Sequence, residues 1–125
     1  MVNEDLNGNK VLIEVDEVAL EDLILLGEDK LINILVEYPQ EDNDIVKIVK
    51  TKAKIKQLTL KELKNVNLNN VDIDVCINIL RKALFQQDGT AFTQNLILAL
   101  PVGVCFAITR EIMKISGVDE KQLGF

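Results

Sequence analysis

The stretch from Val49 to Lys56, VKTKAKIK, constrains the fold more than any other part of the sequence. Lysine occupies every second position, and smaller or branched side chains occupy the positions between. A strict two-residue period places alternate side chains on opposite faces of a β-strand, so the pattern predicts a strand with one lysine-covered face. The charge also fits a strand at the edge of a sheet, because edge lysines oppose aggregation.

The sequence before residue 28 contains one strand signal and one helix signal. The segment KVLIEV, residues 10–15, follows an Asn7-Gly8 turn signal and is short and β-branched, which predicts a strand. From Glu17 the apolar residues recur at roughly helical spacing and Gly27 is a plausible stop, so a helix is expected over residues 17–27 with Asp16 as its cap.

A second helix is expected from Glu28 to Tyr38, because Leu31, Ile32, Leu35 and Val36 are spaced as on one helical face. Pro39 would end it by pushing the preceding residue out of the helical region. The polar run QEDND, residues 40–44, then predicts a turn or an exposed loop.

The second half of the sequence predicts helices. Thr59-Leu-Lys-Glu62 is a capping box that opens a short helix at Leu60. An apolar stripe from Ile73 to Leu84 predicts a helix that stops by Gly89, with Asp72 and Asp74 as first-turn charges. A helical stretch is then expected over residues 91–100, where Phe92, Leu96 and Leu100 recur at four-residue spacing. Pro101 then suits the first turn of a last helix, which Ser116-Gly117-Val118 would close by a Schellman motif.

These elements predict one α+β domain over residues 1–125 that is mostly helical. It would have a short N-terminal strand and the lysine-rich strand ahead of a helical C-terminal half. Its parts are an acidic segment 1–45, a segment 46–118 and a polar tail 119–125. Residues 1–46 carry 13 acids and 2 lysines, whereas residues 47–125 carry 7 acids and 12 bases, so the charge is strongly asymmetric.

Composition excludes several classes of function. The sequence has no histidine, which removes Ser-His-Asp and Cys-His catalysis and histidine-ligated metals. Only Arg81 and Arg110 are arginines and aromatic content is 4%, so nucleic-acid binding is not expected. The longest apolar run, residues 96–108, is too short to span a membrane.

Other candidate chemistry is weak. Acidic pairs such as Glu21-Asp22 are explained as surface or helix-terminal charges, and scattered glycines give no phosphate-binding loop. We therefore expect no catalytic residues, no cofactor and no metal. Cys76 and Cys105 lie in apolar runs without a CxxC partner, which indicates reduced core thiols and a cytoplasmic setting. The acidic, polar start lacks the pattern of a signal peptide.

Three segments in order carry a family resemblance: KIKQLTLKELKNV after the lysine strand, IDVCINILRKALF, and LPVGVCFAITREIMKISGV. Together they resemble the phage tail assembly chaperones, in which a charged strand leads into a similar helix start and a late helix closes at a similar "isG" end. The resemblance covers residues 49–118 and gives the first 45 residues no counterpart.

The resemblance implies a non-enzymatic protein of the host cytoplasm that binds the tape measure protein and tail tube subunits during tail assembly. In that family a longer, frameshifted form is common. An exposed apolar stripe on a partner helix would be covered by helix-in-groove contact. The contact candidates are Phe92, Leu96, Val104 and Phe106 on the late helices, with Lys50, Lys52, Lys54 and Lys56 as a charged face; each apolar member is also explained as ordinary core.

Two other classes remain open. A self-assembling structural subunit of a virion or mobile element would pair the lysine strand with a neighbour's acidic segment, giving a stable homo-oligomer. An acidic inhibitor or DNA mimic would use residues 1–46, although its adjacent acidic pairs are not spaced like phosphates.

Overall fold

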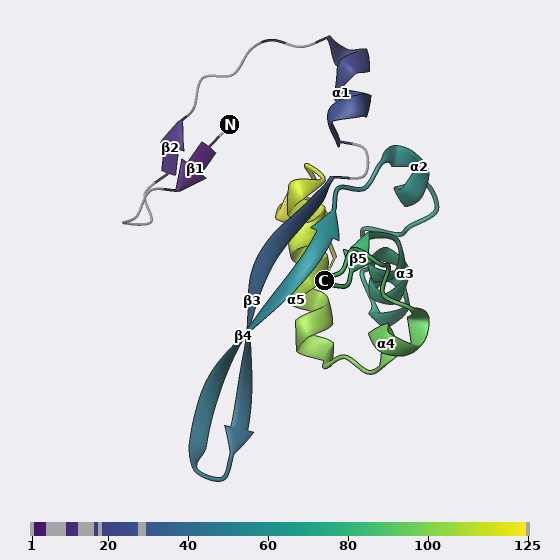
Figure 1. Cartoon of the computed structure of the whole chain (residues 1–125). Coiled ribbons are helices and arrows are strands. Elements are labelled where there is room, and N and C mark those ends of the chain that lie inside the picture. The colour runs from purple at the N-terminus through teal and green to yellow at the C-terminus, as the bar shows by residue number, and fades with distance from the viewer. Residues whose placement is uncertain (1, 5–9, 13–16, 18, 28–29, 125) are drawn as a thin grey trace.

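The computed structural model describes residues 2–4, 10–12, 17, 19–27 and 30–124 (Figure 1). In chain order the elements are β1 (Val2–Glu4), β2 (Lys10–Leu12), α1 (Leu20–Gly27), β3 (Leu31–Asp42), β4 (Ile45–Lys56), α2 (Leu60–Leu63), α3 (Ile73–Ala83), β5 (Leu84–Phe85), α4 (Gln94–Leu98), α5 (Val102–Ile115) and the 3-10 turn η1 (Glu120–Gln122). Strands β1 and β2 pair with each other, and β3, β4 and β5 form an antiparallel sheet in that order.

The α+β class is confirmed, but the expectation of a mostly helical protein is wrong. Strands β3 and β4 span 12 residues each and form one long hairpin. The helix expected over residues 28–38 is instead β3, because Ile32, Ile34 and Val36 alternate toward the core. Opposite them across the hairpin lie Ile55, Ala53 and Thr51. In a short apolar run both periods fit the sequence, and pairing with the lysine strand selects the two-residue one.

The turn or exposed loop expected over residues 40–44 is exposed and contains a turn, but its extent is wrong, because pairing continues as far as Asp42 and Ile45. Only Asn43 and Asp44 connect the strands, and Asn43 has a φ of 57°. Asparagine tolerates this left-handed conformation better than most side chains, as two-residue hairpin loops require.

The strand predicted from the lysine alternation is confirmed. Ala53 and Ile55 are buried on the inner face of β4, and Lys50 and Lys52 are exposed on the outer face. The edge position is wrong at the base of the strand, because β5 pairs with Lys54 and Ile55 and makes β4 the central strand there. Toward the tip, β4 pairs only with β3 among the described strands.

The core lies where α5 packs against the inner face of the hairpin and against α3. Ile112 and Met113 of α5, Ile79 and Leu80 of α3, and Ile55 of β4 are all fully buried. Figure 1 shows α5 running along the base of the hairpin, whose far half extends beyond the helices. Residues 39–48, which we call the hairpin arm, are exposed throughout.

The predicted helix ends are largely confirmed. At α2, the Glu62 N–H donates to the Thr59 hydroxyl and the Thr59 N–H donates to the Glu62 carboxylate, so the capping box is complete. Partial burial would raise the pKa of Glu62, but hydrogen bonds from Lys56 and Thr59 outweigh it and hold the pKa below its ordinary value. Asp72, expected as a first-turn charge, is instead the N-cap of α3, where its carboxylate accepts from the Val75 N–H.

The C-terminal end of α5 has the predicted Schellman geometry. Gly117 has a φ of 83°, its N–H donates to Lys114, and the Val118 N–H donates to Met113 at 2.9 Å. Leu84, expected inside the preceding helix, instead begins β5. The polar tail docks on the rest of the chain, since Gly124 donates to Leu68 at 2.8 Å and accepts from Val71 at 2.7 Å.

The N-terminal elements agree in part with expectation. The strand expected over residues 10–15 is present over Lys10–Leu12, where β2 pairs with β1. The helix expected over residues 17–27 is present as Leu20–Gly27. Asn7-Gly8, residues 13–16 and the expected cap Asp16 lie outside the described residues.

Two glycines, one inside α5 and one just after it, give opposite predictions. Gly103 lies inside the helix and has open space where an alanine methyl would sit, so Gly103→Ala should stabilise the protein by about 0.5 kcal/mol. Gly117→Ala forces alanine into the left-handed region and should destabilise it by about 1–2 kcal/mol. Urea unfolding of both variants measures the difference, and shifts of the same sign would contradict the assigned backbone geometry.

Ser116 links the end of α5 to the segment that follows β4. Its hydroxyl donates to the Ile112 carbonyl at 2.7 Å and accepts from the Leu58 N–H at 2.9 Å. Ser116→Ala leaves that half-buried N–H without a partner, so unfolding free energy should fall by about 1–3 kcal/mol. Ser116→Thr keeps the hydroxyl and should lose less, as thermal unfolding would show; equal losses would rule out this hydrogen bond as the cause.

Candidate protein-binding surfaces

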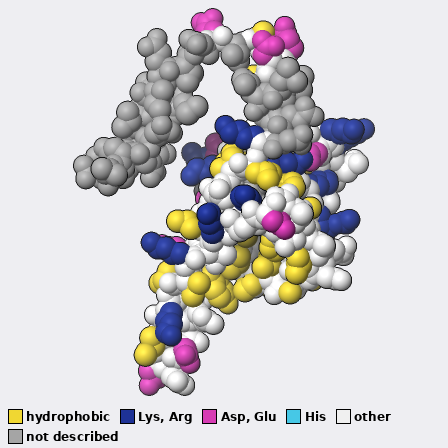
Figure 2. Space-filling view, in the orientation of Figure 1, with side chains coloured by type: hydrophobic (Ala, Val, Ile, Leu, Met, Phe, Trp, Pro, Cys, Tyr) yellow, Lys and Arg dark blue, Asp and Glu magenta, His cyan; other side chains and the backbone are white. Residues whose placement is uncertain are grey.

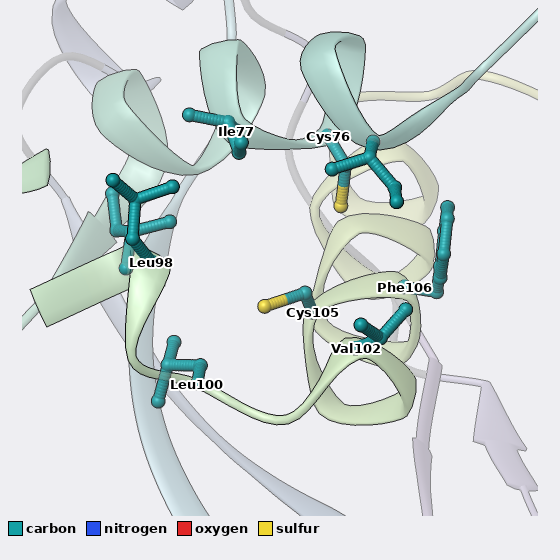
Figure 3. A pocket seen from close by; sticks show the side chains of 9 residues that line it. Cys76, Ile77, Leu98, Leu100, Val102, Cys105 and Phe106 are labelled. Atoms are coloured by element: carbon teal, nitrogen blue, oxygen red, sulfur yellow. The ribbon is translucent and has the colours of Figure 1, made fainter.

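A shallow apolar groove of about 90 Å³ lies between α3, α4 and α5 (Figure 3). The turn from α4 into α5 forms one side of it, where Pro101 sits as the N-cap and lets the chain reverse tightly. We call this the helical groove. Its lining residues are Ile73, Cys76, Ile77, Ile97, Leu98, Leu100, Val102, Cys105 and Phe106.

The rim of the helical groove is apolar and exposed. Ile73, Leu98 and Val102 are 56%, 57% and 56% exposed, although each is a large aliphatic side chain. Asp72 and Pro101 begin the helices that carry Ile73 and Val102, so two helix N-terminal ends meet at this rim. Three clustered, half-exposed aliphatic residues beside a groove are typical of a protein-contact surface.

The floor of the helical groove carries both cysteines. The Thr109 hydroxyl donates to the Cys105 carbonyl at 2.8 Å, so its one proton is used and it accepts from the Cys76 thiol, with Sγ and Oγ1 2.9 Å apart. Burial raises the pKa of the Cys76 thiol, which the hydrogen bond with Thr109 partly offsets. Burial, together with nearby Cys76, raises the pKa of Cys105. Both thiols therefore stay protonated and weakly nucleophilic near neutral pH.

A second apolar cavity of about 260 Å³ lies beside β4, at the point where β5 ends. We call this the sheet-edge cavity. Inner-face side chains of β4 and buried residues of α5 form its walls. Its lining residues are Thr51, Lys52, Ala53, Leu84, Phe85, Gln86, Gln87, Phe92, Leu100, Val104 and Ile108.

Three of the four apolar contact candidates line these two surfaces, and Leu96 lines neither. Phe106 lines the helical groove, and Phe92 and Val104 line the sheet-edge cavity. Val104 is only 4% exposed and belongs to the core, whereas Leu96 on α4 is 42% exposed. The sequence pattern missed Ile73, Leu98 and Val102 as contact residues. Each lies at a helix end, Ile73 at the start of α3 and the other two beside the turn between α4 and α5, where helical spacing does not determine exposure.

The four lysines of the charged face fall into two pairs, one with hydrogen-bond or ion-pair partners and one without such partners among the described residues. Lys56 pairs with Glu62 at 3.1 Å, and the Lys54 ammonium donates to the Gln87 carbonyl at 2.9 Å. For Lys50 and Lys52, further out, no hydrogen bond or ion pair joins the ammonium group to any residue that the structure describes. These two lysines are therefore free to meet an anionic partner.

The hairpin arm is a surface that the sequence pattern did not predict. Ile45, Val46 and Ile48 are 62%, 59% and 57% exposed. Figure 2 shows apolar, basic and acidic side chains mixed along this projecting end. Alternation at Ile32, Ile34, Val36 and Tyr38 was the signal that could have identified β3, and hence the arm.

No protein-family model matches this sequence, and neither a curated protein nor a solved structure is significantly similar to it. Within the described ranges, no helix has both the length and the apolar character needed to cross a membrane. The same residues place no three Cys, Asp or Glu side chains close enough to hold a metal ion. Function must therefore be argued from the surfaces above.

The thiols give a test of the helical groove. With native protein near neutral pH, iodoacetamide should leave Cys76 unmodified and alkylate Cys105 more slowly than a free thiol, because both pKa values are raised and Cys76 is buried. Mass spectrometry of the digested protein measures each site. Denaturant should abolish the difference, and rapid native alkylation of Cys76 would contradict the packing described.

Proposed function

We propose that this protein is a non-enzymatic assembly chaperone of a phage or prophage tail, which binds the tape measure protein and tail tube subunits before they assemble. The observation that carries the proposal is the helical groove with its exposed rim of Ile73, Leu98 and Val102. A long helical partner exposes apolar stripes, and a groove of this kind covers such a stripe by helix-in-groove contact.

The energetics support a reversible contact. Burying the exposed part of each rim residue contributes about 1 kcal/mol, and a partner helix would cover several at once. The loss of translational and rotational freedom offsets much of this gain, which leaves binding moderate rather than permanent. Moderate affinity suits a chaperone that must release its partner during assembly.

The elements on which the resemblance rests give further support. The segment KIKQLTLKELKNV contains the end of β4 and the capped helix α2, and IDVCINILRKA is α3. Pro101 opens α5, and Gly117 closes it. The three quoted segments thus correspond to successive structural units, and the second and third of them supply lining residues of both apolar surfaces.

A second candidate, the self-assembling structural subunit, is favoured by the hairpin arm. Its exposed Ile45, Val46 and Ile48 are the kind of side chains that subunits bury against one another. A fixed stoichiometry of the purified protein with itself, at dilute concentration, would support this candidate over the chaperone.

The chaperone proposal predicts loss of partners when the rim is made polar. Leu98→Glu and Val102→Glu should lower recovery of a very long helical protein and a tail tube subunit with the tagged protein during prophage induction. Both positions are more than half exposed, and glutamate at Val102 is compatible with the first turn of α5, so the fold should persist. Quantitative mass spectrometry of the co-purified proteins measures the effect.

A matched control is Leu60→Glu on α2, because Leu60 is 90% exposed and lies outside the groove. This variant should keep the partners, and circular dichroism should show the same thermal transition for all three proteins. Recovery of the same partners with the rim variants and with Leu60→Glu would refute a role for the groove. If the unaltered tagged protein is recovered without any partner, the chaperone proposal is refuted.

A further inference from the structure

One edge of β4 is left open by β5. Strand β5 pairs only with Lys54 and Ile55, so residues 45–53 are paired on one side alone, with β3, among the described strands. Figure 1 shows β5 beside the base of β4, well short of the tip of the hairpin. The open stretch contains no proline or glycine and is rich in Ile, Val and Thr, which suits strand pairing.

The backbone of this edge is oriented to accept another strand. The Gln87 side-chain amide donates to the Lys52 carbonyl at 3.5 Å, on the side where β5 lies. Because backbone groups alternate in direction along a strand, those of Lys50 and Ile48 point to the same open side. Gln87 thus makes one long contact where an added strand would supply a regular ladder.

The two faces of the edge require different side chains from that strand. On the inner face the sheet-edge cavity, about 260 Å³, adjoins Thr51 and Ala53 and would take an apolar side chain. On the outer face Lys50 and Lys52 are exposed. Glu37 lies opposite Lys50 across the hairpin, but Leu35 lies opposite Lys52, so no acidic residue lies directly opposite Lys52. A strand with alternating apolar and acidic residues satisfies both faces.

The outer edge of β3 differs from the open edge of β4, and this difference makes β3 of a second copy a poor partner strand for β4. Pro39 has no N–H to donate, and proline within a sheet is found where the missing donor faces outward, so it interrupts the outer edge of β3. The β3 strand of a second copy would also bring Val36, which is 5% exposed and held in its own core. At Val36, the β3 strand of a second copy therefore has no free inner-face side chain that could fill the sheet-edge cavity.

We propose that the open edge of β4, residues 45–53, binds an extended acidic segment of a partner protein as an added antiparallel or parallel strand. Backbone hydrogen bonds at Lys50 and Ile48 would hold the strand, the sheet-edge cavity would take its apolar side chains, and Lys50 and Lys52 would select its carboxylates. The sheet-edge cavity shares Leu100 with the helical groove but contains none of the rim residues Ile73, Leu98 and Val102. The inference does not depend on the proposed chaperone function.

The test uses the full chain labelled with ¹⁵N and a soluble peptide of alternating valine and glutamate. Binding should shift the amide resonances of Ile48 and Lys50 and slow their hydrogen exchange, while a peptide of alternating valine and lysine should not bind. Lys50→Glu combined with Lys52→Glu should weaken binding on the order of tenfold, and added salt should weaken binding to the unaltered protein.

Two controls separate the contribution of the lysine charges to peptide binding from that of the backbone hydrogen bonds. Lys61→Glu with Lys64→Glu makes the same charge change at positions in and beside α2 and should leave binding within about twofold. Lys50→Val keeps the N–H and Lys50→Pro removes it, so only the proline variant should lose the ladder contact. Each variant's amide spectrum reports whether it is folded.

Absence of peptide binding to the folded, unaltered protein would overturn the inference. Equal binding of the lysine peptide would also overturn it, since the carboxylates would then have no role. Concentration-dependent self-association that is lost in the Lys50 and Lys52 double variant, measured by sedimentation, would assign the edge to a second copy instead. Rim variants such as Leu98→Glu should bind the peptide normally, so failure of this inference and failure of the chaperone proposal are distinguishable.

Discussion

The packing of α5 against both the hairpin and α3 is the contact on which the rest of the structure depends. Ile112 and Met113 are fully buried between Ile55 of β4 and Ile79 of α3, so one helix serves two neighbours. Removing a side chain from such a position leaves a cavity in the single core of a small domain, at a cost of several kcal/mol. Both apolar surfaces are also lined by α5, so their shape follows from this packing.

Local signals predicted those parts of the fold whose cause is local. The capping box at Thr59 and Glu62 and the left-handed Gly117 each depend on residues within a few positions, and both have the predicted geometry. The lysine alternation in β4 was equally informative, because no other regular structure repeats every two residues. Signals of this kind place elements without a knowledge of tertiary structure.

The predictions from the sequence were wrong where a residue distant in the chain determines the secondary structure or the exposure. Leu31–Asp42 carries a helical spacing and a strand spacing together, and only pairing with β4 selects the strand. Leu84 continues the apolar stripe of α3, but pairing with Ile55 makes it part of β5. The contact candidates show the same limit, since Val104 is core and Leu96 is exposed although both fit a helical stripe. The rim of the groove depends on a turn, which periodicity does not describe.

The length of the hairpin has a consequence for how the molecule meets large partners. Beyond the pair Tyr38 and Val49, the ladder continues to the pair Asp42 and Ile45, a reach of about 13 Å at the usual rise per residue. A contact at the tip is therefore remote from the helical groove, and occupation of one leaves the other accessible. Because the arm is one continuous two-stranded ribbon, a load at its tip is carried by the backbone ladder to the core beneath α5.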